Sequence, residues 1–229
     1  MTTLKLTALI GLLSAFLLAC GAGSDRPPGI WKLPADAHPA LLDPSLAAET
    51  APDRYRVHLA TTKGDVFIEV HRDWAPNGAD RFYNLVQIGF FDEAAFFTVN
   101  QPITAQFGIS PYPTVTEVWD PLKIPDDPVR KSNTRGRITG AKSPQPDSRS
   151  TQFFINLGNL EQMDPYDFAP FGDVVEGMEV LDALYGGYGN APPQGDGPIQ
   201  NTISQYGNVY LADRFPKLDA IVTARVISP

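Results

Sequence analysis

Two glutamine side chains stand among large apolar residues, in stretches with the composition of β-strands. Side chains of a strand alternate between its two faces, so Gln152 shares one face with Phe154, while Phe153 and Ile155 share the other. The second pair can fill a core. The first can line a pocket that offers hydrogen bonds beside an aromatic ring, and Gln106 repeats this pattern. Taken singly, each stretch favours the alternative of an edge strand with one polar residue.

Residue types that usually carry bond-making chemistry are scarce. Three histidines and one cysteine leave no ligand set for a structural zinc. The chain has no G-x-S-x-G motif, the turn that carries the nucleophile of many serine hydrolases. His71-Arg72-Asp73 and Asp167-Phe168-Ala169 echo protein-kinase signatures, but the glycine after Asp-Phe and a Gly-rich nucleotide loop are missing. These enzyme classes are therefore set aside.

The composition suits one domain with appendages. The chain has 229 residues, of which 43% are hydrophobic, enough for one full core. Its 22 Pro and 19 Gly predict a loop-rich fold. A formal net charge of -8 and a pI near 4.8 give little support to contacts with phosphate backbones, so nucleic acid is not expected as a partner.

The first nineteen residues have the pattern of an export signal. Lys5 precedes an apolar run over residues 6–19 that ends in small residues. At about 14 residues, the run is shorter than the ~20 that a membrane-spanning helix needs. Residues 17–21 resemble the lipobox of bacterial lipoproteins, which predicts a signal peptide over residues 1–19 and a lipid on Cys20. The alternative is an ordinary cleaved signal peptide with an incidental cysteine.

Residues 20–53 are rich in Pro and Ala and show no sustained apolar period. They predict a tether between Cys20 and a domain of residues 54–229, although Trp31 and the pair Leu41-Leu42 could dock on that domain. Cys20 is the only cysteine, so packing rather than a disulfide must stabilise the domain.

The domain shows alternating strand patterns at both ends and helical patterns between them. Pro76 suits the first position of a helix and Gly89 its end. The predicted elements are strands at 55–60 and 66–70 joined by a turn, a helix from 76, a loop over 110–127, a strand and helix start within 168–180, an insertion over 186–217 with a short helix at 208–215, and a strand at 218–225.

Both glutamine stretches, 96–109 and 150–156, and this order of elements resemble the cyclophilins, the prolyl-isomerase family. The resemblance covers residues 55–185 and the last ten residues. It implies a mainly β fold, a closed eight-stranded antiparallel barrel with one helix over each open end. It also implies a monomer with no cofactor and no metal.

In cyclophilins, glutamines hold the peptide backbone and apolar side chains line a pocket for the proline ring. The matching substrate-binding positions here are Ile103, Thr104, Gln106, Ser143, Pro144, Gln152, Phe154, Met163 and Phe168. Several depart from the family. Ile103 and Thr104 replace Phe and Met, which makes the pocket smaller or more polar, Ser143 and Pro144 replace an Asn-Ala pair, and Phe168 replaces a frequent His.

Thr98 occupies the position of the family's catalytic arginine. No Lys or Arg occurs between Arg81 and Lys123, so a small shift of alignment cannot restore the cation. Loss of one transition-state donor in other enzymes lowers the rate by ~10² to 10³, so weak or absent activity is expected. Without the resemblance, Thr98 is an ordinary strand residue.

The resemblance predicts a peptidyl-prolyl cis-trans isomerase that acts on X-Pro bonds of exported proteins, weakened at Thr98. Its partners would be proline-containing segments of envelope proteins, and a lipid anchor would hold it to a membrane of the cell envelope. One alternative is a catalytically impaired module that binds proline peptides as a chaperone or scaffold. Another is a structural envelope protein whose groove is closed by its own tether or insertion.

Overall fold

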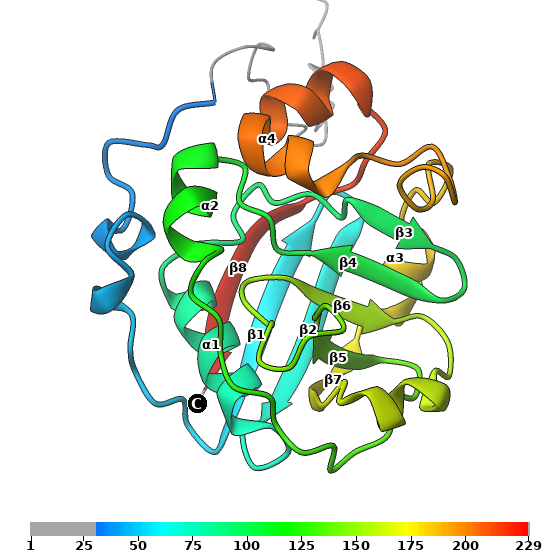
Figure 1. Ribbon diagram of the computed structural model, residues 1–229. Coiled ribbons are helices and arrows are strands. Elements are labelled where there is room, and N and C mark those ends of the chain that lie inside the picture. The colour runs from blue at the N-terminus through cyan, green and yellow to red at the C-terminus, as the bar shows by residue number, and fades with distance from the viewer. Residues whose placement is uncertain (1–30, 229) are drawn as a thin grey trace, which may run out of the picture.

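The computed structural model describes residues 31–228, and Figure 1 shows their arrangement. Eight antiparallel strands form one curled sheet in the order β3-β4-β6-β5-β7-β2-β1-β8. The fold is mainly β, as predicted. The strands are β1 (Arg54–Thr61), β2 (Gly64–His71), β3 (Thr98–Asn100), β4 (Thr104–Phe107), β5 (Arg137–Gly140), β6 (Phe153–Asn156), β7 (Pro170–Glu176) and β8 (Ile221–Ser228).

The first two strands form the predicted hairpin. Thr61 pairs with Gly64 across the turn, and the inward-facing residues alternate along both strands, as their sequence pattern requires. The residues that face the core are Tyr55, Val57, Leu59, Val66, Ile68 and Val70, each at most 1% exposed. The core packs against the inner face of this hairpin.

The prediction of a closed barrel is wrong, because the sheet is open between β3 and β8. The chain before β3 meets the chain before β8 at a single isolated bridge, Ala95 to Ala220. Three backbone hydrogen bonds lie around it, from Phe96 to Asp219, from Ile221 to Ala94 and, at 3.4 Å, from Glu93 to Val222. β3 then runs for only three residues beside β4, while β8 follows β1, so no ladder forms between the two edges.

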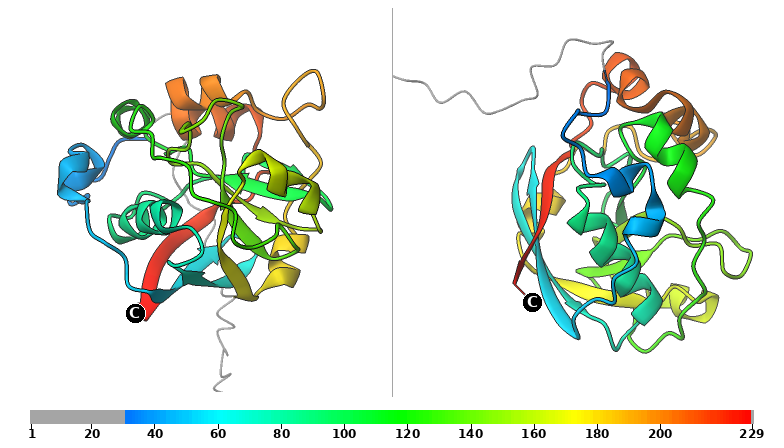
Figure 2. Two further views of the ribbon diagram at one scale, coloured as in Figure 1. Left: turned by 60° about the horizontal axis from the view of Figure 1, so that its bottom comes forward. Right: turned by 90° about the vertical axis from the view of Figure 1, so that its left-hand side faces the viewer.

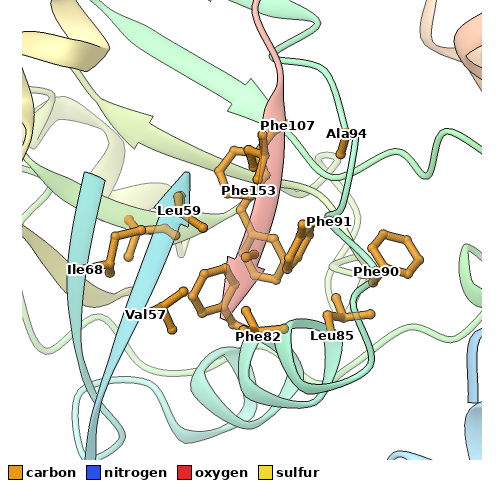
Figure 3. Packing of buried hydrophobic residues seen from close by; sticks show 14 of the residues in the cluster. Val57, Leu59, Ile68, Phe82, Leu85, Phe90, Phe91, Ala94, Phe107 and Phe153 are labelled. Carbon is orange, nitrogen blue, oxygen red and sulfur yellow. The ribbon is translucent and has the colours of Figure 1, made fainter. Parts of the chain in front are cut away.

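Helix α1 (Pro76–Gln87) lies inside the curl and begins at Pro76, as predicted, and its buried side chains include Phe82, Leu85 and Val86. Figure 3 shows Phe82 and Leu85 of this helix directed toward the strands. The ring of Phe82 lies 5.2 Å from Phe153 of β6 and 5.5 Å from Phe91. Each buried aromatic of this kind contributes about 1.5–3 kcal/mol through burial alone, so these rings couple the helix to the pocket strands.

The prediction of a loop over residues 110–127 is wrong in its first part, which forms α2 (Pro113–Trp119). Pro113 occupies a first-turn position where its missing N–H costs nothing. Val115 and Trp119 lie four residues apart and are both buried, a spacing typical of one helical face. The loop was predicted because prolines are frequent in this stretch.

Two further α-helices follow β7. They are α3 (Met178–Asp182) and α4 (Gln200–Arg214), and α4 kinks at Gly207. The helix inside the predicted insertion is therefore longer than the predicted 208–215. α4 packs on α2, as the orange and green helices of Figure 1 show. The described residues hold four α-helices, and the prediction of one helix over each end is not confirmed.

The described part of the predicted tether, residues 31–53, lies along the domain. It contains two short 3-10 helices, Pro39–Leu41 and Pro44–Leu46. Ala40 and Leu41 are buried, whereas Leu42 is 52% exposed. Trp119 Nε1 donates to the Ala40 carbonyl at 3.1 Å. Figure 2 shows this segment in blue, running beside α1 and α2.

The predicted signal peptide over residues 1–19 and the lipidation of Cys20 lie outside the described residues. Of the helices within residues 31–228, none has the length and apolar character needed to cross a membrane.

Candidate functional site

The strand register lines up the pocket residues in one row. Thr98 of β3 pairs with Gln106 of β4, and Gln106 pairs with Phe154 of β6. Directly opposed residues of antiparallel strands point to the same face. Phe153 and Ile155, on the opposite face, are buried in the core. The period-two prediction for these strands is therefore confirmed.

This face opens into a groove with a cavity of about 490 Å³. Seven of the predicted site residues line it, namely Thr104, Gln106, Ser143, Gln152, Phe154, Met163 and Phe168. Three do not. Ile103 is 42% exposed outside the cavity, Pro144 follows the lining residue Ser143, and Thr98 lies beside Gln106 at the edge of the row.

One part of the lining is apolar, and we call Phe154, Met163 and Phe168 the apolar patch. The rings of Phe154 and Phe168 meet edge to face at 5.8 Å, a favourable aromatic geometry. Met163 comes from the 3-10 helix η3 (Glu161–Tyr166). The patch is therefore assembled from β6, η3 and Phe168, which lies two residues before β7.

Asp164 and Asn133 hold η3 in place beside the groove. Asp164 Oδ1 accepts from the backbone N–H and the side-chain amide of Asn133 at 2.9 and 2.8 Å, and Oδ2 accepts from Ser132. Asn133 is fully buried and also donates to the Phe168 carbonyl at 2.7 Å. Burial raises the pKa of Asp164, but the hydrogen bonds from Ser132 and Asn133 outweigh it, so the pKa is lowered.

The two groove glutamines contact each other. Gln106 Nε2 donates to Gln152 Oε1 at 2.9 Å, which leaves the remaining amide groups of the pair for a ligand. Gly108 allows this approach: its φ is +106°, and a Cβ there would lie 2.3 Å from the Thr151 carbonyl. Only glycine suits such a position, so β4 and the start of β6 come together because residue 108 has no side chain.

The rest of the lining is mostly polar. We call the following residues the polar wall: Asp120, Lys123, Lys142, Ser143, Ser148, Ser150 and Gln200. Of these only Ser143 was predicted. Ser150 lies two and four residues before Gln152 and Phe154, so the period-two pattern could have identified it. Gln200 and Asp120 belong to segments far away in the sequence, and no local signal identifies them.

The charges of the polar wall are paired. Lys142 Nζ lies 2.8 Å from Asp126 Oδ2 and is 5% exposed, and Lys123 Nζ lies 3.3 Å from Asp120 Oδ1. Burial raises the pKa of Asp126, but the hydrogen bonds from Lys142 and the Asp147 backbone outweigh it and lower the pKa. Asp126 therefore stays ionised and neutralises Lys142.

Behind the wall lies the buried side chain of Arg149, 1% exposed. Its guanidinium pairs with Asp127 at 3.0 Å and with Asp126 at 3.3 Å. Asp127 in turn accepts from the backbone N–H groups of Asn77 and Gly78 in the first turn of α1. This network ties the loop that carries Lys142 and Ser148 to the central helix, since removing one member of a buried ion pair is strongly unfavourable.

The described residues contain no cluster of three or more His, Cys, Asp or Glu side chains that could hold a metal ion. What the groove can do chemically is hold a peptide. It has an apolar patch for a ring, amide groups for a backbone and a neutral polar wall, as ligand grooves commonly combine.

Comparisons with known proteins agree with this geometry. Residues 56–204 match the family model described as cyclophilin type peptidyl-prolyl cis-trans isomerase/CLD. The chain is 28% identical over 166 residues to peptidyl-prolyl cis-trans isomerase A of Dickeya dadantii, covering 71% of this chain and 84% of that protein. It is 29% identical over 134 residues to peptidyl-prolyl cis-trans isomerase B of Escherichia coli, covering 55% and 81%.

A solved structure has a similar fold. The crystal structure of a cyclophilin from Hirschia baltica superposes with a TM-score of 0.57 at 16% identity, covering 78% of this chain and 76% of that one.

Proposed function

Because the chain belongs to the cyclophilin-type peptidyl-prolyl cis-trans isomerase family, we propose that its groove binds X-Pro segments and accelerates their cis-trans isomerisation weakly. The observation that carries the proposal is the apolar patch of Phe154, Met163 and Phe168 beside the hydrogen-bonded pair Gln106 and Gln152. A proline ring can pack on the apolar patch, and the backbone that flanks the proline can form hydrogen bonds with the two glutamines.

The reaction breaks no covalent bond, so the site has to stabilise an amide that twists out of its plane. The barrier in water is ~18–20 kcal/mol, and the uncatalysed step takes ~10–100 s. A groove that holds the ring on Phe154 and the backbone on Gln106 and Gln152 favours the twisted amide if these contacts strengthen as resonance is lost. A cation near the prolyl nitrogen would add to this as the lone pair localises there.

That cation is what the groove lacks. Thr98, at the family's arginine position, carries no charge, and the two lysines of the described cavity lining are ion-paired with Asp120 and Asp126. Losing one transition-state donor lowers rates by ~10² to 10³ in other enzymes. We therefore propose an activity well below that of an arginine-containing relative.

The test is to measure cis-trans exchange of a blocked X-Pro peptide by NMR, with and without the full chain. We expect a small acceleration over the uncatalysed rate, which Phe154→Ala abolishes because it removes the surface for the ring. Tyr166→Ala is the matched control, since Tyr166 is 69% exposed and lies outside the cavity lining. A peptide that neither binds nor exchanges faster would refute the proposal.

A second candidate function follows from the same missing cation. A groove with intact contacts to ring and backbone but no charge at position 98 can bind a proline segment without accelerating its isomerisation, as a chaperone or scaffold module does. Peptide binding that Gln106→Ala or Phe154→Ala abolishes, with no acceleration of exchange, would favour this function over the enzyme.

We further propose that the protein is exported and lipid-anchored at Cys20, and that its clients are proline-containing segments of envelope proteins. The support is the apolar run over residues 6–19 followed by the lipobox-like residues 17–21. With an anchored Cys20, the groove would act near the membrane surface.

A further inference from the structure

The groove offers two different surfaces to a peptide longer than one residue. If the apolar patch holds a proline ring, the residues that flank the proline extend along the row of Gln106 and Gln152 to the polar wall. The side chain that reaches this wall meets hydroxyl, amide and ion-paired groups rather than apolar ones.

The polar wall is neutral as a whole. Lys142 is paired with Asp126, and Lys123 with Asp120. A charged ligand side chain would find both lysines of the wall already paired with carboxylates. A large apolar side chain would displace water from the polar groups of the wall without replacing the hydrogen bonds of that water, which is unfavourable. The surface therefore suits a side chain that is polar and uncharged.

The serines of the wall are already engaged. Ser150 Oγ donates to the Trp119 carbonyl at 3.0 Å, and Ser148 Oγ donates to the Gln145 carbonyl at 2.7 Å. Ser143 Oγ accepts from the backbone N–H of Gln145 and donates to Gln145 Oε1 at 3.4 Å. These hydroxyls shape the wall, and their donors are directed at the protein itself.

Gln200 differs from the rest of the wall. Within residues 31–228, its side chain makes no hydrogen bond, so both the amide oxygen and the amide nitrogen can contact a ligand. It is the first residue of α4, inside the inserted segment 186–217. α4 packs on α2, and Asp120 of the wall directly follows α2, which explains how the insertion reaches the groove.

We infer that Gln200 determines specificity: it selects peptides in which a residue near the proline has an uncharged polar side chain, such as glutamine, asparagine or serine. The inference rests on the proposed function, because it concerns a peptide held in the same groove. The inserted segment thereby belongs to the recognition surface.

The experiment measures binding of the full chain to two matched sets of blocked proline peptides by NMR titration. One set places glutamine, and the other leucine, in turn at each of the two positions before and after the proline. We expect glutamine to bind about two- to tenfold tighter than leucine at one of these positions, the worth of one net hydrogen bond. Gln200→Met, which keeps length and helix propensity, should remove the preference.

Asn201→Met is the matched control, because Asn201 is also exposed at the start of α4 but does not line the cavity. It should keep the preference. Proline peptides that bind with no preference at any position, or a preference that survives in Gln200→Met, would overturn the inference while leaving the proposed function intact. If no proline peptide binds at all, the proposed function fails and the inference fails with it.

Discussion

The side chain at position 98 faces the same way as Gln106 and Phe154, because Thr98 and Gln106 are cross-strand partners and so are Gln106 and Phe154. A longer side chain there would extend over the row of pocket residues. Position 98 is thus placed to carry a charge toward a bound prolyl nitrogen, and threonine, short and uncharged, does not supply one.

We predict that Thr98→Arg raises the rate of X-Pro isomerisation by about one to two orders of magnitude, part of the ~10² to 10³ that one transition-state donor supplies. The full gain is not expected, since Thr104 packs a proline ring less well than a larger apolar residue, and a shift of ~1 Å can cost ~10² in rate. A protease-coupled assay on an X-Pro peptide measures it.

Thr98→Gln is the control for this prediction, because it adds length and hydrogen-bond donors without a charge. It should leave the rate near that of the wild type. Wild-type turnover already comparable to that of an arginine-containing cyclophilin would contradict the argument, as would an equal gain from both variants.

At the scale of elements, η3 depends on a few side-chain contacts for its position. It is a 3-10 helix with Pro165 inside it and no side-chain cap, so its own backbone hydrogen bonding is weak. Asp164 anchors it to Asn133, which is fully buried. The contact between Asp164 and Asn133 therefore also holds Met163 of the apolar patch in position.

We predict that Asp164→Ala lowers the free energy of unfolding by about 1–3 kcal/mol, because it leaves buried donors of Asn133 without a partner. Proline-peptide binding should weaken as well, since Met163 loses its position. Urea unfolding and peptide titration measure the two effects. Glu161→Ala is the control, because Glu161 is an exposed residue of the same helix.

The effect of Asp164 should depend on pH. Its pKa is lowered in the folded protein from the ordinary value of 3.8, so its carboxylate stabilises the fold above that value. The contribution is lost as the pH falls through the lowered pKa. The stability difference between wild type and Asp164→Ala should therefore be largest above about pH 4 and shrink on acidification; a difference that is constant down to pH 2 would contradict this.

At the scale of the whole molecule, the predicted lipid anchor concerns the chain that precedes the domain. Residues 31–53 lie along α1 and α2, with the Asn84 amide exchanging two hydrogen bonds with the Glu49 backbone. Hydrogen bonds at Ala40 and Glu49 therefore hold this segment against the domain.

We predict that Cys20→Ala abolishes partitioning of the protein into a detergent phase, while the wild type expressed in a bacterium partitions there, because lipid chains on Cys20 supply the membrane affinity. The variant should accumulate as an unprocessed precursor or in the aqueous phase. Cys20→Ser gives the same expectation with a smaller change in polarity. Equal partitioning of wild type and variants would refute the lipoprotein proposal.

Local patterns determined a large part of this structure. The alternation in β1 and β2, the Pro76 start of α1 and the shared face of Gln152 and Phe154 depend on short-range geometry, which a sequence displays directly. Thr104, Gln106 and Phe154 line the cavity for the same reason: they lie on the regular strands β4 and β6, and register follows from which face is buried. Ser143, Met163 and Phe168 lie outside the strands, and only the family resemblance pointed to them.

The tertiary structure decided what depends on distant segments. Whether the sheet closes depends on the paths of β3 and β8 after their single bridge at Ala95 and Ala220, and no local pattern encodes these paths. The polar wall joins Asp120, Ser150 and Gln200, which are brought together because α4 packs on α2 and Ser150 donates to the carbonyl of Trp119, the last residue of α2. Side-chain alternation is a property of one strand, whereas such contacts between distant segments exist only once the whole chain has packed.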